Sequence, residues 1–174
     1  MDEPSNNFTV NTTEILIQEW FRRARKNQRI HYQCADHFSR KTKLLGVPTI
    51  VISTAVGSAV FASIEHESSG AVKVALGLLS ILAAVLASLQ TFLSYPERAE
   101  KHRITSAKYA SVRRQLELMA ADVNRSQEET ITQLAGIQKE LDACAASAPH
   151  VPQHIEEHVK TEIDETRRVS GKQS

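Results

Sequence analysis

The stretch LLGVPTIVISTAVGSAVFASI, residues 44–64, contains no charged residue, and neither does VALGLLSILAAVLASLQTFLSY, residues 74–95. At about 1.5 Å per helical residue, each stretch spans roughly 30 Å, the thickness of the hydrocarbon core of a bilayer. Only nine residues separate them, so the second helix must run antiparallel to the first. Because lipid offers the backbone no hydrogen-bond partner, such a pair is typical of a transmembrane hairpin. The alternative, two core helices of a soluble bundle, seldom contains neighbouring uncharged runs of this length.

The distribution of charge predicts how the hairpin is oriented. The 174-residue chain has a formal net charge of +1, without the basic excess typical of nucleic-acid binding, and its two cysteines provide no disulfide framework. Six Lys and Arg residues fall in the 20 residues before residue 44, six in the 20 after residue 95, and one, Lys73, in the loop. The positive-inside rule therefore predicts two spans in the inner membrane with both termini in the cytoplasm.

The remaining segments also carry helical patterns. We expect an all-α fold, a two-helix transmembrane hairpin with long cytoplasmic helical extensions. Residues 1–12 are expected to be disordered, and residues 150–174 to form a short amphipathic helix and a polar tail. Between them lies a helical membrane domain, residues 13–146, in which apolar residues recur three and four positions apart. Its cytoplasmic helices are predicted over 13–43, 96–123 and 126–146, the last opened by a capping box.

An inward-facing seam is predicted along the two cytoplasmic helices that flank the hairpin. If both continue from the membrane helices with equal rise, residues equally far from the bilayer face each other. This counting pairs His37 with His102, His31 with Lys108 or Tyr109, and Trp20 with Met119. The polar middle of one seam then lies against the polar middle of the other, which fixes register. The residues assigned to the seam are Trp20, His31, His37, His102 and Tyr109.

Small and polar residues mark helix-packing or pore-lining positions inside the spans. Small residues four positions apart let membrane helices approach closely, because lipid supplies no hydrophobic drive for their contact. The amide of Gln90, near the inner end of its span, is expected to face the partner helix or a water path rather than lipid. The positions assigned to this role are Ser53, Gly57, Ser80, Ala84, Ser88 and Gln90.

Little in the sequence points to catalysis or to a metal. His31, Cys34 and His37 cover an arc of roughly 120° on one helix, so they cannot close a tetrahedral zinc site alone. A second set of histidines, at positions 150, 154 and 158, shares one face but has no clearly placed further ligand. The sequence shows no Ser-His-Asp set, Gly-rich phosphate loop or paired-carboxylate pocket. We therefore expect no enzyme, no cofactor and no metal site.

A cluster of cations covers the side of the first cytoplasmic helix away from the seam. We interpret it as a solvated face that also contributes to the topology signal. The alternative is contact with anionic lipid headgroups at the inner leaflet. The cluster comprises Arg22, Arg23, Arg25, Lys26 and Arg29.

Two segments carry a resemblance to a known family. WFRRARKNQRIHYQCA, residues 20–35, and YPERAEKHRITSAKY, residues 95–109, flank a Gly- and Pro-marked first span and resemble the SLATT family over residues 14–145. SLATT proteins are two-transmembrane effector domains associated with SMODS nucleotidyltransferases and SLOG nucleotide-sensing domains in bacterial conflict systems. The resemblance implies a homo-oligomeric, pore-forming membrane effector of anti-phage defence that disrupts the inner membrane. No SLOG domain is visible, so we expect a separate trigger, a nucleotide second messenger or a cytoplasmic sensor protein.

Two other functions stay open. The chain could be a passive membrane anchor or scaffold that places cytoplasmic partners at the inner leaflet. It could instead be an accessory subunit of a transporter, although the lack of ionisable residues within the spans argues against transport. Induced expression separates the pore from the scaffold, since a pore predicts growth arrest with dye entry and a scaffold predicts harmless membrane localisation.

Overall fold

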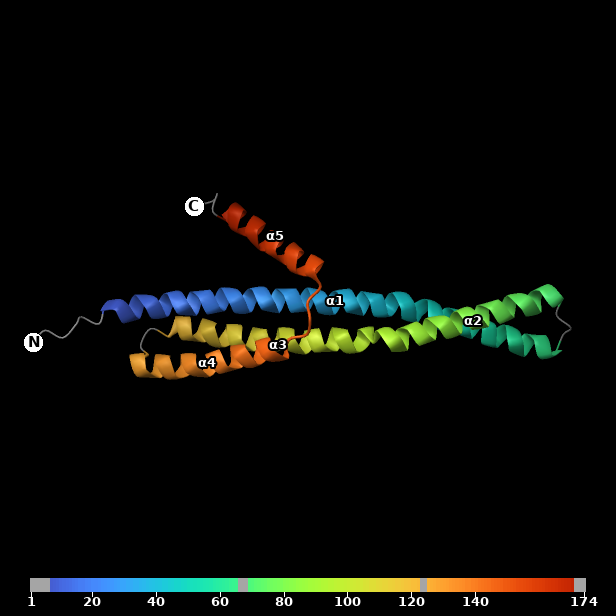
Figure 1. Ribbon diagram of the computed structural model, residues 1–174, viewed down its shortest axis with the longest axis horizontal. Coiled ribbons are helices and arrows are strands. Elements are labelled where there is room, and N and C mark those ends of the chain that lie inside the picture. The colour runs from blue at the N-terminus through green and yellow to red at the C-terminus, as the bar shows by residue number, and fades with distance from the viewer. Residues whose placement is uncertain (1–6, 66–68, 123–124, 171–174) are drawn as a thin grey trace, which may run out of the picture. The chain divides into compact units, whose positions relative to one another are not determined.

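The computed structural model describes residues 7–65, 69–122 and 125–170. These residues form five α-helices and no strand (Figure 1), which confirms the predicted all-α class. They divide into two compact units: residues 36–99, which we call the membrane unit, and residues 1–35 with 100–174, which we call the bundle unit. In chain order the helices are α1 (Asn7–Glu65), α2 (Gly70–Leu93), α3 (Tyr95–Ala121), α4 (Gln127–Ser147) and α5 (Gln153–Ser170).

The membrane unit contains the two segments that are long and apolar enough to cross a membrane, one in α1 and one beginning with α2. In the most apolar 18 residues of each segment, 6% and 0% of the residues are buried. Helices in the core of a soluble protein would bury most of their large apolar side chains. These helices instead expose nearly all of that surface, as helices facing lipid would.

Several hydroxyl groups within the two spans are hydrogen-bonded inside their own helices. The Oγ1 atom of Thr49 donates to the carbonyl oxygen of Leu45 at 2.7 Å, and Ser88 donates to the carbonyl oxygen of Ala84 at 2.8 Å. Thr54, Ser80 and Thr91 form the same bond to the carbonyl four residues earlier. Because each of these five side chains pairs its hydroxyl hydrogen within its own helix, it is compatible with a lipid environment.

The chain breaks its helix at Ser94, between α2 and α3. Ser94 has φ of 45° and ψ of 39°, the left-handed conformation, and its N–H donates to the carbonyl oxygen of Gln90. α3 then begins at Tyr95 and places Pro96 in its first turn, where a missing N–H costs no helical hydrogen bond. The sequence allowed either a fresh helix or a hinged continuous one at Pro96, and the structure has the fresh helix.

The bundle unit is built on a core shared by α1, α3 and α4. Leu116 and Val112 of α3 are among its largest fully buried side chains. Ala24 of α1, with no exposed surface, lies in the same cluster, because a methyl side chain lets neighbouring helices approach closely. The buried members are Ala24, Tyr109, Val112, Leu116, Met119, Leu134, Ile137, Leu141 and Cys144.

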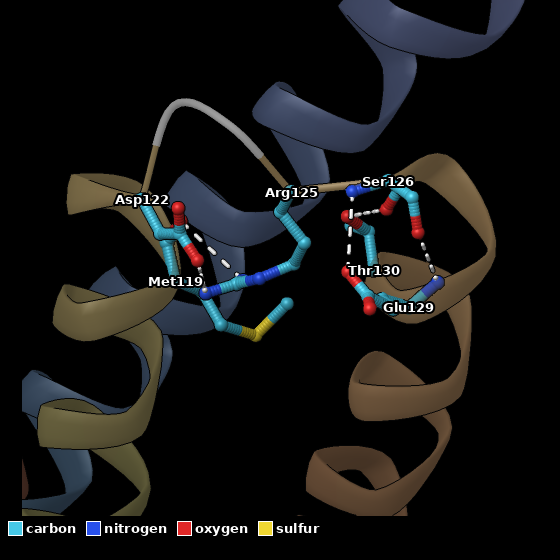
Figure 2. A network of polar contacts seen from close by, with 6 residues as sticks. All are labelled: Met119, Asp122, Arg125, Ser126, Glu129 and Thr130. Atoms are coloured by element: carbon cyan, nitrogen blue, oxygen red, sulfur yellow. Dashed lines mark hydrogen bonds and ion pairs between the residues drawn. The ribbon is translucent and has the colours of Figure 1, made fainter.

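The connection from α3 to α4 ends in the predicted capping box (Figure 2). The hydroxyl of Ser126 accepts from the backbone N–H of Glu129, and the Glu129 carboxylate accepts from the N–H of Ser126, both at 3.3 Å. Arg125, whose side chain is 11% exposed, reaches back to α3 and donates to the Asp122 carboxylate at 3.3 Å. Its guanidinium also donates to the carbonyl oxygen of Met119 at 3.5 Å, so it ties the end of α3 to the start of α4.

The last helix, α5, packs on α1 through a second apolar cluster. Ile155 and Val159 of α5 are buried together with Ile30 and Cys34 of α1. In Figure 1, α5 lies on the side of α1 away from α3 and α4. The apolar residues of α5 recur every four positions, so this face was predictable, whereas its docking site on α1 was not.

The helix limits differ from the expected ones mainly at the start of the chain. α1 begins at Asn7, so residues 7–12, expected to be disordered, are helical; residues 1–6 lie outside the described part. α4 begins within one residue of the prediction. α5 is longer than a short terminal piece, at 18 residues, and the end of the polar tail, residues 171–174, lies outside the described part.

Candidate functional site

A pair of buried histidines lies in the seam of the bundle unit. The Nδ1 atoms of His31 on α1 and His102 on α3 are 2.9 Å apart, a hydrogen-bond distance. The two residues are only 4% and 1% exposed. Tyr109 stacks on the His31 ring with 5.8 Å between ring centroids and 9° between ring planes. Three residues of the predicted seam therefore form one contiguous polar cluster inside the bundle.

Burial controls the charge of this pair. Desolvation, with a smaller contribution from the neighbouring His102, lowers the pKa of His31 from 6.5 to about 4. Desolvation also lowers the pKa of His102. At neutral pH both rings are therefore uncharged, and one Nδ1–H donates a hydrogen bond to the other Nδ1. A second proton between the two Nδ1 atoms would leave two donors facing each other, so the geometry favours the neutral pair.

The buried cysteines of the bundle unit are poorly suited to reactivity. Burial raises the pKa of the Cys34 thiol to about 11. Burial also raises the pKa of Cys144. Since the thiolate is the reactive form, both side chains act as small core residues at neutral pH.

The contacts within the seam agree only in part with the predicted register. His102 contacts His31, a pairing that the counting did not give. The proposed neighbours His31 and Tyr109 are in contact, and Trp20 packs against the cluster that contains Met119, as predicted. His37 belongs to the membrane unit, where it is half-buried and its ring meets Phe38 edge-on at 5.5 Å.

The membrane unit shows why the counting failed. Phe38 and Tyr95 stack with 5.9 Å between their ring centroids, and the Lys41 ammonium lies 5.5 Å from the centre of the Tyr95 ring. Tyr95 is therefore level with Phe38, whereas the counting paired it with Leu44. The counting used Leu44, the first uncharged residue, as the membrane level that matches Tyr95. The span can begin before Leu44, because Lys41 and Lys43 can extend their charged ends along the helix toward water.

The six packing or pore-lining positions separate into two groups. Ser53, Gly57, Ser80, Ala84 and Ser88 are all exposed within a single chain, so the structure brings none of them together. Gln90 is half-buried and faces α1: a Cβ atom built on Gly46 would lie 3.1 Å from its Nε2 atom. Gly46 thus makes room for the Gln90 amide, a role that sequence reasoning missed, since it treated Gly46 only as a marker of bending.

Among the described residues, no group of three or more His, Cys, Asp or Glu side chains could hold a metal ion. The family model for SMODS and SLOG-associating 2TM effector domain family 4 matches residues 14–155. The chain belongs to this family. No curated protein and no solved structure matches it.

Membership in this family identifies the membrane as the environment of the exposed helices. A SLATT domain is a two-transmembrane effector domain, so the two apolar segments are the spans of a membrane protein. The family is one of membrane effectors and not a known enzyme family. Its match ends at residue 155, just after α5 begins, so nearly all of α5 lies beyond the part that the family model covers.

Proposed function

We propose that this SLATT protein is a membrane effector of a bacterial conflict system that assembles into a homo-oligomeric pore. Family membership supports the effector role. The observation that carries the pore is the exposure of both spans, including the ridge of Ser80, Ala84 and Ser88. Small residues on an exposed membrane face suit close contact with another helix better than contact with lipid.

Assembly is part of the proposal because two helices cannot enclose a channel. Several hairpins packed through the α2 ridge would provide the wall. The uncharged spans, residues 44–64 and 74–95, offer no ring of charge to select ions. Such a pore would conduct through small polar surfaces or open by wetting of an apolar constriction. The proposal keeps both termini on the cytoplasmic side of the inner membrane, where a nucleotide second messenger or a sensor protein would act on the bundle unit.

Induced expression tests the proposal. A pore predicts growth arrest and entry of propidium iodide, and Ala84→Leu should reduce both because a larger side chain blocks close approach. Ala75→Leu is the matched control: it is exposed on the same helix, nine residues away, and therefore on the opposite side. Cross-linking in nanodiscs should give oligomers for the wild type and Ala75→Leu, and fewer for Ala84→Leu.

Two results together would contradict the pore: the wild type reaches the membrane without harming growth, and cross-linking under activating conditions finds only monomers. That result would instead favour the scaffold, which needs the spans only as an anchor. Equal effects of the two substitutions would show that the ridge has no special role in assembly.

A further inference from the structure

Two depressions in the bundle unit meet at Arg25 and Arg29 of α1. The first, about 550 Å³, lies between α1 and α5, and the second, about 400 Å³, lies between α1 and α3. Both volumes are in the range of small-molecule sites. Besides the two arginines, the first is lined by Gln18, Phe21, Arg22, Arg23, Lys26, Ile163 and Thr166, and the second by Gln28, Tyr32 and Arg113.

The charge of these depressions is one-sided. Together they are lined by six cationic side chains, five of them arginine, and by no carboxylate. Two nearby carboxylates offset part of this charge: Glu162 pairs with Arg29, and Glu117 lies 3.6 Å from Nε of Arg113. The sequence favoured a solvated face for the cations of α1. In the structure these cations instead line concave surfaces that α1 forms with α5 and with α3.

Unsatisfied polar atoms accompany the charge. The Nε atom of Arg113 and the Oε1 atom of Gln28 are buried and have no hydrogen-bond partner. Buried polar groups without partners are rare in folded proteins. Both residues line the second depression. A ligand there with hydrogen-bond acceptors would satisfy the arginine, and one that also carries a hydroxyl would satisfy the glutamine.

We propose that the basic depressions at Arg25 and Arg29 bind a ligand that carries two or more phosphate groups. Arginine matches phosphate because its planar guanidinium donates two parallel hydrogen bonds to two oxygens. A single phosphate would engage only part of the six cations, whereas a polyphosphate can extend across both depressions. The ligand is either a soluble polyphosphate or the headgroup of a phospholipid with two phosphates, such as cardiolipin, since both present this chemistry.

Part of the site lies beyond the residues that the family model matches. Ile163 and Thr166, which line the first depression, belong to α5 and lie beyond the family match. Glu162 of α5 accepts from Arg29 and from Gln33 at 3.2 Å, so its carboxylate occupies a position that a phosphate would compete for. Removing the charge of Glu162 should therefore strengthen binding, the opposite of what loss of a structural contact predicts.

The test is calorimetric titration of the full chain, in nanodiscs of phosphatidylcholine alone, with inorganic tripolyphosphate. We expect saturable binding that Arg25→Gln with Arg29→Gln weakens about tenfold or more. Arg103→Gln with Lys139→Gln removes the same charge from exposed positions of the bundle unit outside both depressions, and should leave the affinity unchanged. Fluorescence of the single tryptophan verifies folding of each variant.

Glu162→Gln keeps the shape of the side chain and should raise the affinity about threefold. Absence of tripolyphosphate binding, equal weakening by the two double variants, or weaker binding by Glu162→Gln would each overturn the proposal. Nanodiscs of phosphatidylcholine with cardiolipin, which carries two phosphates, identify the source: competition assigns the site to lipid headgroups, and unchanged affinity assigns it to a soluble ligand. Because binding is measured without leakage, its failure is distinct from failure of the pore.

Discussion

Acidification should destabilise the bundle unit through its buried histidine pair. In the folded protein the pKa of His31 is lowered from 6.5 to about 4, and that of His102 is lowered as well. The unfolded chain therefore binds protons that the folded bundle does not. Stability from this source is fully present above about pH 6.5 and is lost as the pH falls from there toward about 4.

The size of the effect follows from the pKa of His31. Its displacement from 6.5 to about 4 corresponds to about 3 kcal/mol in the free energy of unfolding, of which about 2 kcal/mol is lost between pH 7.5 and 5. His102 adds to this loss in the same direction. Restricting the comparison to pH 5 and above keeps carboxylate protonation small, because ordinary carboxyl pKa values lie near 4.

Trp20 provides the assay, because it is the single tryptophan and packs against the bundle core. Urea unfolding of the full chain in nanodiscs, followed by tryptophan fluorescence, should show the loss between pH 7.5 and 5. His31→Leu with His102→Leu should remove the pH dependence, since it replaces both titrating groups with apolar side chains. A wild type equally stable at both pH values, or a double variant that loses as much, would refute the reasoning. His150→Gln with His158→Gln, at exposed positions, is the control and should behave like wild type.

Three further outcomes are expected. A reporter inserted at Ser69 should be external while reporters at either terminus are cytoplasmic, and a cytoplasmic result at Ser69 would contradict the hairpin. Ser126→Ala should lower the stability of the bundle unit by about 1 kcal/mol in the same urea assay, because it removes the hydroxyl of the capping box. Cysteines at Phe38 and Tyr95 should cross-link readily and those at Leu44 and Tyr95 poorly, in a background without native cysteines; the reverse pattern would restore the predicted register.

The seams were predictable because helical periodicity reports which residues face inward. His31, His102 and Tyr109 were assigned to the interior from spacing alone, and all three are buried. The spans were also predictable from the sequence, since an uncharged stretch of this length is typical of a transmembrane helix. These properties depend on neighbours within one helix, and the sequence contains them directly.

The register was not predictable in the same way, because it depends on which residues of two helices are level. A lysine near the end of a span can extend its charged head toward water, so the position of the charge locates that end only to within the length of the side chain. Lys41, for example, lies over the ring of Tyr95. Tyr95 meets Phe38, six residues before its predicted partner Leu44, and His102 still faces a histidine of α1, His31. The polar middle of both seams was predicted, while the contact between His31 and His102 was not.

The docking of α5 separates an apolar contact from a charged one. Ile155 and Val159 pack with Ile30 and Cys34, and this cluster does not depend on charge. The pair between Glu162 and Arg29 lies farther along α5, with side chains 34% and 40% exposed, where water and phosphate can reach it. Exposed ion pairs contribute little to stability, so exchanging the carboxylate for a phosphate would leave the apolar cluster to hold α5. The chain can therefore keep this helix in place while the charge beside it is replaced, which is what the proposed phosphate site requires.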